Sequence, residues 1–206
     1  MARPFLTGDQ RQAFEVKIKR AALMLFAREG YRATSLRAIA RELRCSATAL
    51  YSYYDSKESL LAALRAEGFI IMRQHLADAR TGSATSVDAV RHAILAYLDF
   101  AGQQPELFQL MYELDQGEIA NDPVVANERR LAFAEAQGIT ADLLVASGLD
   151  GDANLLAHIL WISAHGLVTA SLARQLDLGF SREALIEPLI QTLLRGALPA
   201  GASTNV

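Results

Sequence analysis

The helical spacing of apolar residues constrains this chain more than any other feature. From Phe14 to Phe26, apolar residues recur at i, i+4, i+7, i+8, i+11 and i+12, which places them in one stripe along a helix. Segments with this periodicity follow one another along the chain, and the alternating pattern of strands is nearly absent. Because 51% of the residues are hydrophobic, the chain has ample material for a core. The sequence therefore predicts an all-α globular protein.

Capping residues divide the periodic segments into nine predicted helices. Gly30 should end the first helix, Thr34 or Ser35 should cap the second, and Ser46 should cap the third. Asp55 or Ser56 should cap the fourth, where Glu58 follows Asp55 by three residues in a capping-box arrangement. Ser86 and Asp152 should begin two later helices, and Pro105 suits the first turn of another. Gly138 could interrupt one helix, and Pro188 should kink another. The predicted helices cover residues 14–29, 36–43, 47–54, 56–79, 86–103, 105–117, 122–147, 153–177 and 182–195. The first three are short.

Charge is distributed unevenly between the front of the chain and the rest. Residues 1–65 contain 12 Lys and Arg against 6 Asp and Glu, whereas residues 66–206 contain 8 against 17. A basic N-terminal part followed by an acidic remainder indicates that the N-terminal part binds a polyanion and the remainder does not. This asymmetry favours nucleic acid as a partner of the first three helices.

Several features favour a reducing, cytoplasmic location. The first ten residues lack an apolar run of the signal-peptide type, and the single Cys45 excludes an internal disulfide framework. The most apolar segment, residues 155–173, is interrupted by polar residues such as His158 and Ser163. We therefore interpret it as a buried helix rather than a membrane span, and we expect no membrane partner.

The second and third predicted helices have the spacing of a helix-turn-helix. Only a few residues around Leu43 separate them, so the helices must cross steeply, and the small Ala40 suits their crossing point. In this motif the second helix enters the major groove of DNA. Leu50 and Tyr54 should face the core, which leaves small and hydroxyl-bearing side chains facing outward.

The outward residues carry groups suited to DNA. Thr48 could hydrogen-bond a base edge, the Tyr51 hydroxyl could reach a phosphate, and Lys57 lies beside free N–H groups at a helix start. The predicted DNA contacts are Thr34, Ser35, Arg37, Arg44, Ser46, Ala47, Thr48, Ala49, Tyr51, Ser52 and Lys57.

The run FAREGYRATSLRAIARELRCSATALYSYYDSKESLLAAL, residues 26–64, resembles the TetR/AcrR family of bacterial transcriptional regulators. The positions that match the family pattern are Phe26, Gly30, Tyr31, Thr34, Ser35, Ile39, Ala40, Ser46, Leu50, Tyr51, Tyr54, Ser56, Lys57 and Glu58. PELFQLMY (105–112) and LWISAHGLV (160–168) resemble a subgroup with a Trp…His-Gly signature in its C-terminal domain. Family members usually have Gly in the helix-turn-helix turn, so Arg44 should adopt a positive φ here.

The resemblance implies a nine-helix architecture with a helix-turn-helix domain at residues 11–55 and a ligand-binding and dimerisation domain at 56–196. Residues 1–10 and 197–206 would be flexible termini. It further implies a homodimer formed through the last two helices, a palindromic operator, and release from DNA by a small, mostly apolar effector. The helix from Ser56 would transmit the effector's presence. The implied pocket residues are Phe108, Met111, Tyr112, Trp161 and His165.

Other interpretations remain open from the residues themselves. Simple core packing suits each pocket candidate as well as a ligand does. We interpret Cys45 as a small core residue in the helix-turn-helix turn, with redox sensing as the alternative. His158 and His165 have no third ligand at a spacing suited to metal, and the familiar enzyme motifs are absent, so we predict no catalytic residue, metal or cofactor. The alternative function is a helical small-molecule-binding protein whose front helices merely pack. The effector, the operator and the sense of its regulation are left open.

Overall fold

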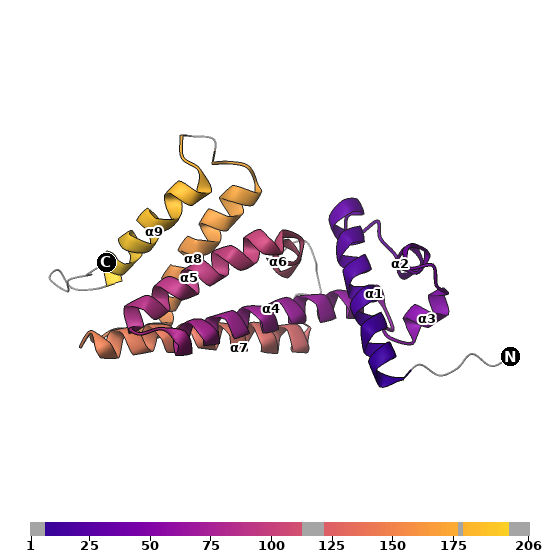
Figure 1. Ribbon diagram of the computed structural model, residues 1–206, viewed down its shortest axis with the longest axis horizontal. Helices are drawn as coiled ribbons and strands as arrows, with labels where there is room; N and C mark the ends of the chain where they lie inside the picture. The colour runs from indigo at the N-terminus through magenta and orange to yellow at the C-terminus, as the bar shows by residue number, and fades with distance from the viewer. Residues whose placement is uncertain (1–6, 113–121, 177–178, 198–206) are drawn as a thin grey trace. The chain divides into compact units, whose positions relative to one another are not determined.

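The computed structural model describes residues 7–112, 122–176 and 179–197, and these ranges contain nine α-helices and no strand (Figure 1). The all-α prediction is confirmed. The helices are α1 (Gly8–Glu29), α2 (Leu36–Glu42), α3 (Ala47–Tyr51), α4 (Lys57–Gly82), α5 (Ser86–Gln103), α6 (Pro105–Tyr112), α7 (Pro123–Ala146), α8 (Ala153–Leu172) and α9 (Arg182–Ala197).

The chain divides into two compact units. Unit 1 comprises Met1–Gly68 and Glu106–Ala126, and unit 2 comprises Phe69–Pro105 and Asn127–Val206. The long helix α4 therefore contributes its first twelve residues to unit 1 and the remainder to unit 2. These units are defined by compactness, and unit 1 also includes α6. The predicted boundary between a DNA-binding domain (11–55) and a ligand-binding domain (56–196) is a division by function, and it stays a prediction.

Several predicted helix ends are confirmed. Gly30 ends α1 with a φ of 82°, a conformation that glycine adopts without strain. Ser46 and Asp152 cap α3 and α8 as expected, and of the two candidates for α2, Ser35 is the cap. Each of these side chains accepts a hydrogen bond from a backbone N–H that has no partner within its helix.

Other predicted ends are wrong. Thr7 caps α1 in a capping box with Gln10, so residues 7–10 are ordered in the first turn and not part of a flexible terminus. The box that begins α4 joins Ser56 to Ser59 rather than Asp55 to Glu58, because each serine hydroxyl accepts the other residue's N–H, at 3.0 and 3.2 Å.

The remaining boundaries shift by a few residues. Thr85, one residue before the predicted cap, begins α5, and α3 ends before Tyr54. α4 continues past Ala79 to Gly82, and α8 ends at Leu172. The predicted end of α6 at Gly117 lies outside the described residues.

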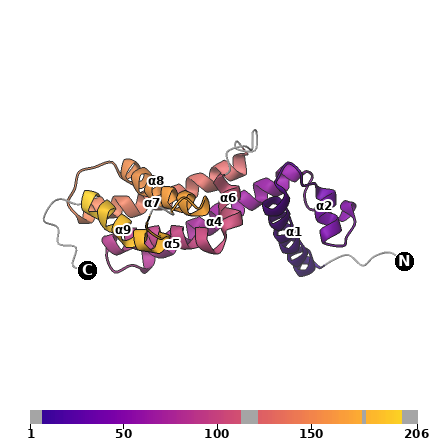
Figure 2. The same ribbon diagram turned by 90° about the horizontal axis from the view of Figure 1, so that it is seen from above.

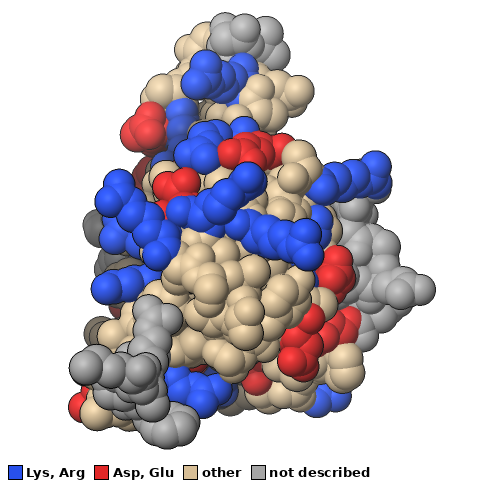
Figure 3. Space-filling model, turned by 90° about the vertical axis from the view of Figure 1, so that its right-hand side faces the viewer, with Lys and Arg blue, Asp and Glu red and all other residues tan. Residues whose placement is uncertain are grey.

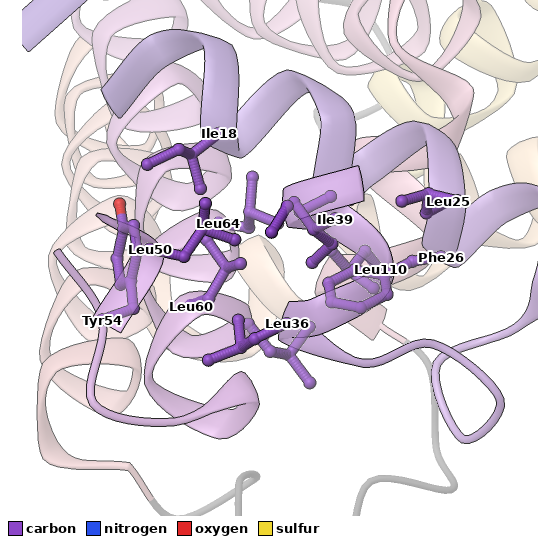
Figure 4. Packing of buried hydrophobic residues seen from close by; sticks show 13 residues of the cluster. Ile18, Leu25, Phe26, Leu36, Ile39, Leu50, Tyr54, Leu60, Leu64 and Leu110 are labelled. Atoms are coloured by element: carbon purple, nitrogen blue, oxygen red, sulfur yellow. The ribbon is translucent and has the colours of Figure 1, made fainter. Parts of the chain in front are cut away.

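Unit 1 is built around one cluster of buried residues (Figure 4). α1 contributes the predicted stripe, α2 and α3 contribute Ile39 and Leu50, and α4 contributes leucines at its start. Leu110 of α6, distant in sequence, completes the cluster. The members are Ile18, Ala22, Leu25, Phe26, Leu36, Ile39, Ala40, Leu50, Tyr54, Leu60, Leu61, Leu64 and Leu110.

In unit 2, α7 runs parallel to the second part of α4 (Figures 1 and 2). Arg73 pairs with Glu128 at 3.7 Å, and further along both helices Arg80 donates two hydrogen bonds to Asp142. The Arg80 guanidinium passes over Gly138, where a Cβ would lie 2.3 Å from Nη1. Gly138 therefore does not interrupt α7, and its missing side chain gives the guanidinium room.

α5, α8 and α9 complete unit 2. α5 presents a buried face to α8 that includes Ile94, Tyr97 and Leu98. The first residue of α9, Arg182, donates to the carbonyl of Leu98 near the C-terminal end of α5, where partially negative carbonyls favour a cation.

Candidate nucleic-acid interface

The turn between α2 and α3 is the tight connection that the sequence predicts. Arg44 has a φ of 52°, as expected for a residue in the position where relatives of this motif have glycine. The N–H of Cys45 donates back to the carbonyl of Ala40 at 3.0 Å, which closes the end of α2. Ala40 is buried between the helices, so its small side chain permits their close crossing.

The short helix α3 is fixed at both ends and exposes one face. The Ser46 hydroxyl accepts from the N–H of Ala49 at 3.2 Å, and Leu50 is fully buried in the core of unit 1. Thr48 is exposed, and Tyr51 exposes 48% of its surface. This face is small and uncharged, which suits close approach to base edges in a groove.

Most predicted DNA contacts reach the surface of unit 1. Ser35, Arg37, Arg44, Ser46, Thr48, Tyr51 and Ser52 are exposed, and Ala47, Ala49 and Lys57 are half-buried. Ala47 also packs against the core of unit 1, so only part of it is available to a partner.

Thr34 is the exception, and its predicted DNA contact is wrong. Its side chain is only 2% exposed, and its hydroxyl donates to the carbonyl of Gly30 at 2.9 Å and lies 3.4 Å from that of Leu25. Thr34 therefore stabilises the loop before α2, and its hydroxyl cannot meet a phosphate.

Lys57 is held in position by the loop between α1 and α2. Its Nζ donates to the carbonyl of Tyr31 at 2.8 Å and lies 4.1 Å from the centre of the Tyr31 ring. The Tyr31 hydroxyl in turn donates to Glu58 at 2.9 Å, and burial together with this carboxylate raises the pKa of Tyr31. An ammonium has three N–H donors, so Lys57 retains donors for a phosphate.

Unit 1 exposes many cations. Figure 3 shows Lys and Arg side chains bordering an uncharged area, with acidic side chains at its lower right and others interspersed among the cations above it. Arg28 is paired with Glu29 at 2.8 Å, which partly neutralises that position. Within the described part of unit 1, the exposed cations are Arg11, Lys17, Arg20, Arg28, Arg32, Arg37, Arg41 and Arg44. Such a surface attracts a polyanion with little dependence on sequence.

Sequence reasoning missed a set of contacts between the start of α1 and the residues after α3. Arg11 donates from Nη2 to the carbonyl of Ser52 at 3.2 Å, and its guanidinium lies over the Tyr53 ring. The two residues of the hydrogen bond are 41 positions apart, and Arg11 reads in the sequence as one more solvated cation. No local pattern could have found this pair.

In unit 2, two of the predicted pocket residues meet on a buried tyrosine. Trp161 donates from Nε1 to the Tyr97 hydroxyl at 3.2 Å, and His165 Nδ1 lies 2.8 Å from the same oxygen. Burial lowers the pKa of His165, so its neutral form is favoured. His158 contacts the Phe133 ring and the carbonyl of Asn154 instead.

The other predicted pocket residues lie on α6 in unit 1. Phe108 and Met111 are buried, and Tyr112 is half-buried with its ring 4.9 Å from that of Phe108. The structure thus brings the five candidates together in two groups, one in each unit. Their membership of one cavity stays a prediction. Among the described residues, no group of three or more His, Cys, Asp or Glu could hold a metal ion.

Two protein-family models match the chain. Residues 18–64 match the model of bacterial regulatory proteins of the tetR family, which covers the helix-turn-helix described above. Residues 90–193 match the model of the tetracyclin repressor-like C-terminal domain. Together the two models span most of both compact units.

Solved structures share the fold. A protein of unknown function from Rhodococcus sp. RHA1 has a TM-score of 0.78 at 23% identity and covers 95% of this chain and 98% of its own. A TetR/AcrR-family regulator from Thermobifida fusca has a TM-score of 0.68 at 23% identity, over 89% and 98%. The regulator FadR from Bacillus subtilis, in complex with stearoyl-CoA, has a TM-score of 0.75 at 18% identity, over 88% and 98%. With the helix-turn-helix and both family models in agreement, this chain belongs to the TetR/AcrR family of transcriptional regulators.

Proposed function

We propose that this protein is a cytoplasmic, ligand-responsive transcriptional repressor that binds a near-palindromic operator as a homodimer. The observation that carries the proposal is the exposed face of α3. Thr48 and Tyr51 are exposed there, within residues 1–65, which contain 12 Lys and Arg against 6 Asp and Glu. Thr48 would contact a base edge, and Tyr51 with Lys57 and the neighbouring arginines would contact phosphates.

A homodimer is supported by the surface of α8. Among the described residues, α8 is the one helix that is long and apolar enough to cross a membrane. Only 28% of its apolar stretch is buried, and Leu155, Ile159 and Ile162 form an exposed stripe at helical spacing. Because the other face packs on α5 and α9, a second copy is the cover that we propose for the stripe.

Dimerisation also matches what DNA reading requires. One five-residue helix contacts too few base pairs for useful specificity. Two copies placed about 34–36 Å apart would read successive major grooves.

Regulation by a mostly apolar effector is supported by the way α6 is built into unit 1. Leu110 belongs to the core that positions α3, while Arg65 of α4 donates to the carbonyl of Met111 at 3.0 Å. An effector that contacts Phe108 or Tyr112 would therefore act on a helix that shares its core with α2 and α3. The coupling needs only about 1–3 kcal/mol of differential affinity.

Trp161 and His165 both contact the Tyr97 hydroxyl. From this arrangement we infer that the protein belongs to the subgroup with a Trp…His-Gly signature. The stearoyl-CoA in the FadR structure is a ligand with a long apolar chain, and we extend that kind of ligand to this protein.

The test combines DNA and ligand binding. DNA from immediately upstream of the protein's own gene should be retarded at low salt, and a scrambled duplex of equal length should not compete. A series of fatty acyl-CoA thioesters, screened by thermal shift, should raise the unfolding midpoint and then release the DNA. Ligand present at 100 times its Kd would stabilise the protein by about 2.7 kcal/mol. Retardation without sequence preference would contradict the proposal, and preference without any effector response would limit it to DNA binding.

A further inference from the structure

The C-terminal end of α3 depends on α1 for one of its hydrogen bonds. The carbonyl of Leu50 accepts from the N–H groups of Tyr53 and Tyr54, and that of Ala49 accepts from the Ser52 hydroxyl at 2.7 Å. The carbonyl of Ser52 accepts from Arg11 instead, at 3.2 Å. A guanidinium at this end also suits the partial negative charge of the helix terminus.

Three residues of α1 meet the three residues that follow α3. Arg11 lies with its Cζ 5.2 Å from the centre of the Tyr53 ring, and Phe14 makes an edge contact with the same ring at 5.5 Å. Glu15 accepts a hydrogen bond from the Tyr54 hydroxyl at 2.9 Å. Because Arg11, Phe14 and Glu15 are spaced i, i+3 and i+4, they share one face of α1. We name these three residues the α1 clamp.

We propose that the α1 clamp sets the orientation of α3 on DNA, and that Arg11 is its main positioning residue. The inference rests on the proposed function and adds a specificity-determining element outside the helix-turn-helix. A five-residue helix is far too short to be stable alone, so its direction is set by its attachments. Ser46 and Leu50 fix its start and its buried face, and the α1 clamp fixes its end.

This role differs from a phosphate contact in what it predicts for binding. A residue that neutralises a phosphate contributes to all DNA sequences alike and to the salt slope, at about 0.9 per phosphate. A residue that orients α3 contributes mainly to the preferred sequence, because misdirected side chains lose base contacts and retain phosphate contacts.

The experiment uses the full chain and two duplexes. One is the duplex that the wild-type protein selects from a random-sequence pool, and the other is a scrambled duplex of the same length. Arg11→Ala removes the guanidinium, and Tyr53→Leu removes the ring beneath it without changing the charge. Arg20→Ala is the matched control, because Arg20 is an exposed cation of α1 that makes no hydrogen bond or ion pair within the described part of the chain.

Arg11→Ala should lower the ratio of selected to scrambled affinity about five- to tenfold, as expected for the loss of one hydrogen bond and one cation–π contact. Tyr53→Leu should lower it by a similar factor, because the guanidinium loses the ring that holds it against the Ser52 carbonyl. The salt slope should stay unchanged for Tyr53→Leu and nearly unchanged for Arg11→Ala. The double variant should lose little more than either single variant, because the two residues act as a unit. Arg20→Ala should leave the ratio unchanged.

Three results would overturn the inference. An equal loss on both duplexes with a slope lower by about 0.9 would make Arg11 a phosphate contact. A lower unfolding midpoint with an unchanged ratio, measured well below that midpoint, would make the α1 clamp purely structural. If the loss in the double variant equals the sum of the two single losses, Arg11 and Tyr53 act independently rather than as a unit. If the wild-type protein selects no duplex, the proposed function itself fails, and that is seen before any variant is made.

Discussion

Replacing Gly68 tests the packing between α4 and α6. Gly68 lies inside α4, where glycine costs about 1 kcal/mol relative to alanine, so Gly68→Ala would stabilise an isolated helix. In the folded protein, however, an added Cβ would lie 2.4 Å from Sδ and 2.7 Å from Cγ of Met111. Met111 is only 1% exposed, so its side chain cannot move into solvent.

The two effects oppose each other with different magnitudes. Forcing an extra methyl into a packed site costs about 1–3 kcal/mol, and the gain in helix propensity offsets about 1 kcal/mol of that cost. We therefore expect Gly68→Ala to lower the free energy of unfolding by about 0–2 kcal/mol. In a Met111→Ala background the obstacle is gone, and the same change should raise the free energy of unfolding by about 1 kcal/mol.

Urea unfolding of the four proteins, at one protein concentration, completes a double-mutant cycle. The reversal of sign between the two backgrounds is the diagnostic result, because Met111→Ala itself costs about 2–5 kcal/mol whatever Gly68 does. If Gly68→Ala stabilises both backgrounds equally, Met111 does not pack against Gly68 and the described fit of α6 on α4 is wrong.

Three further changes test other parts of the account. Lys57→Ala should weaken binding to all DNA sequences and lower the salt slope by about one, and Lys57→Arg should restore the slope, both measured by anisotropy across a salt series. An unchanged slope in Lys57→Ala, or no recovery of the slope in Lys57→Arg, would remove Lys57 from the phosphate contacts. Thr48→Ala should relax the preference at one or two operator positions, by about 1–3 kcal/mol if Thr48 pairs with a base, and equal losses on specific and random DNA would argue against base contact. Because burial lowers the pKa of His165, the unfolded state binds a proton more readily than the folded state. Stability should therefore fall as the pH drops below about 6.5, and His165→Gln should reduce that fall; an identical pH dependence of urea midpoints in both proteins would contradict it.

Much of the fold could be predicted because its signals are local. The stripe of α1, the Gly30 end and the Ser46 cap each depend on residues a few positions apart. The positive φ of Arg44 is expected from the family resemblance instead, because relatives usually have Gly at this position. Leu50 could be assigned to the core for the same reason, since helical spacing separates the buried face of α3 from the exposed one.

The failures concern residues whose roles depend on distant partners. Thr34 reads as a polar residue at a helix start, but the carbonyl of Gly30, directly after α1, satisfies its hydroxyl and allows its burial. Gly138 reads as a helix interruption until Arg80, 58 positions earlier in the sequence, is seen to occupy the space above it. Arg11 and Tyr97 likewise gain their roles from contacts across the fold.

The most direct test of the central claim is a footprint of the purified protein on the duplex that it selects from a random-sequence pool. If α3 of two copies reads successive major grooves, the protected DNA should contain two half-sites related by a dyad, with centres about 10–10.5 base pairs apart or a multiple of that spacing. Selection of no preferred sequence, or protection of a single half-site with full affinity, would contradict the account.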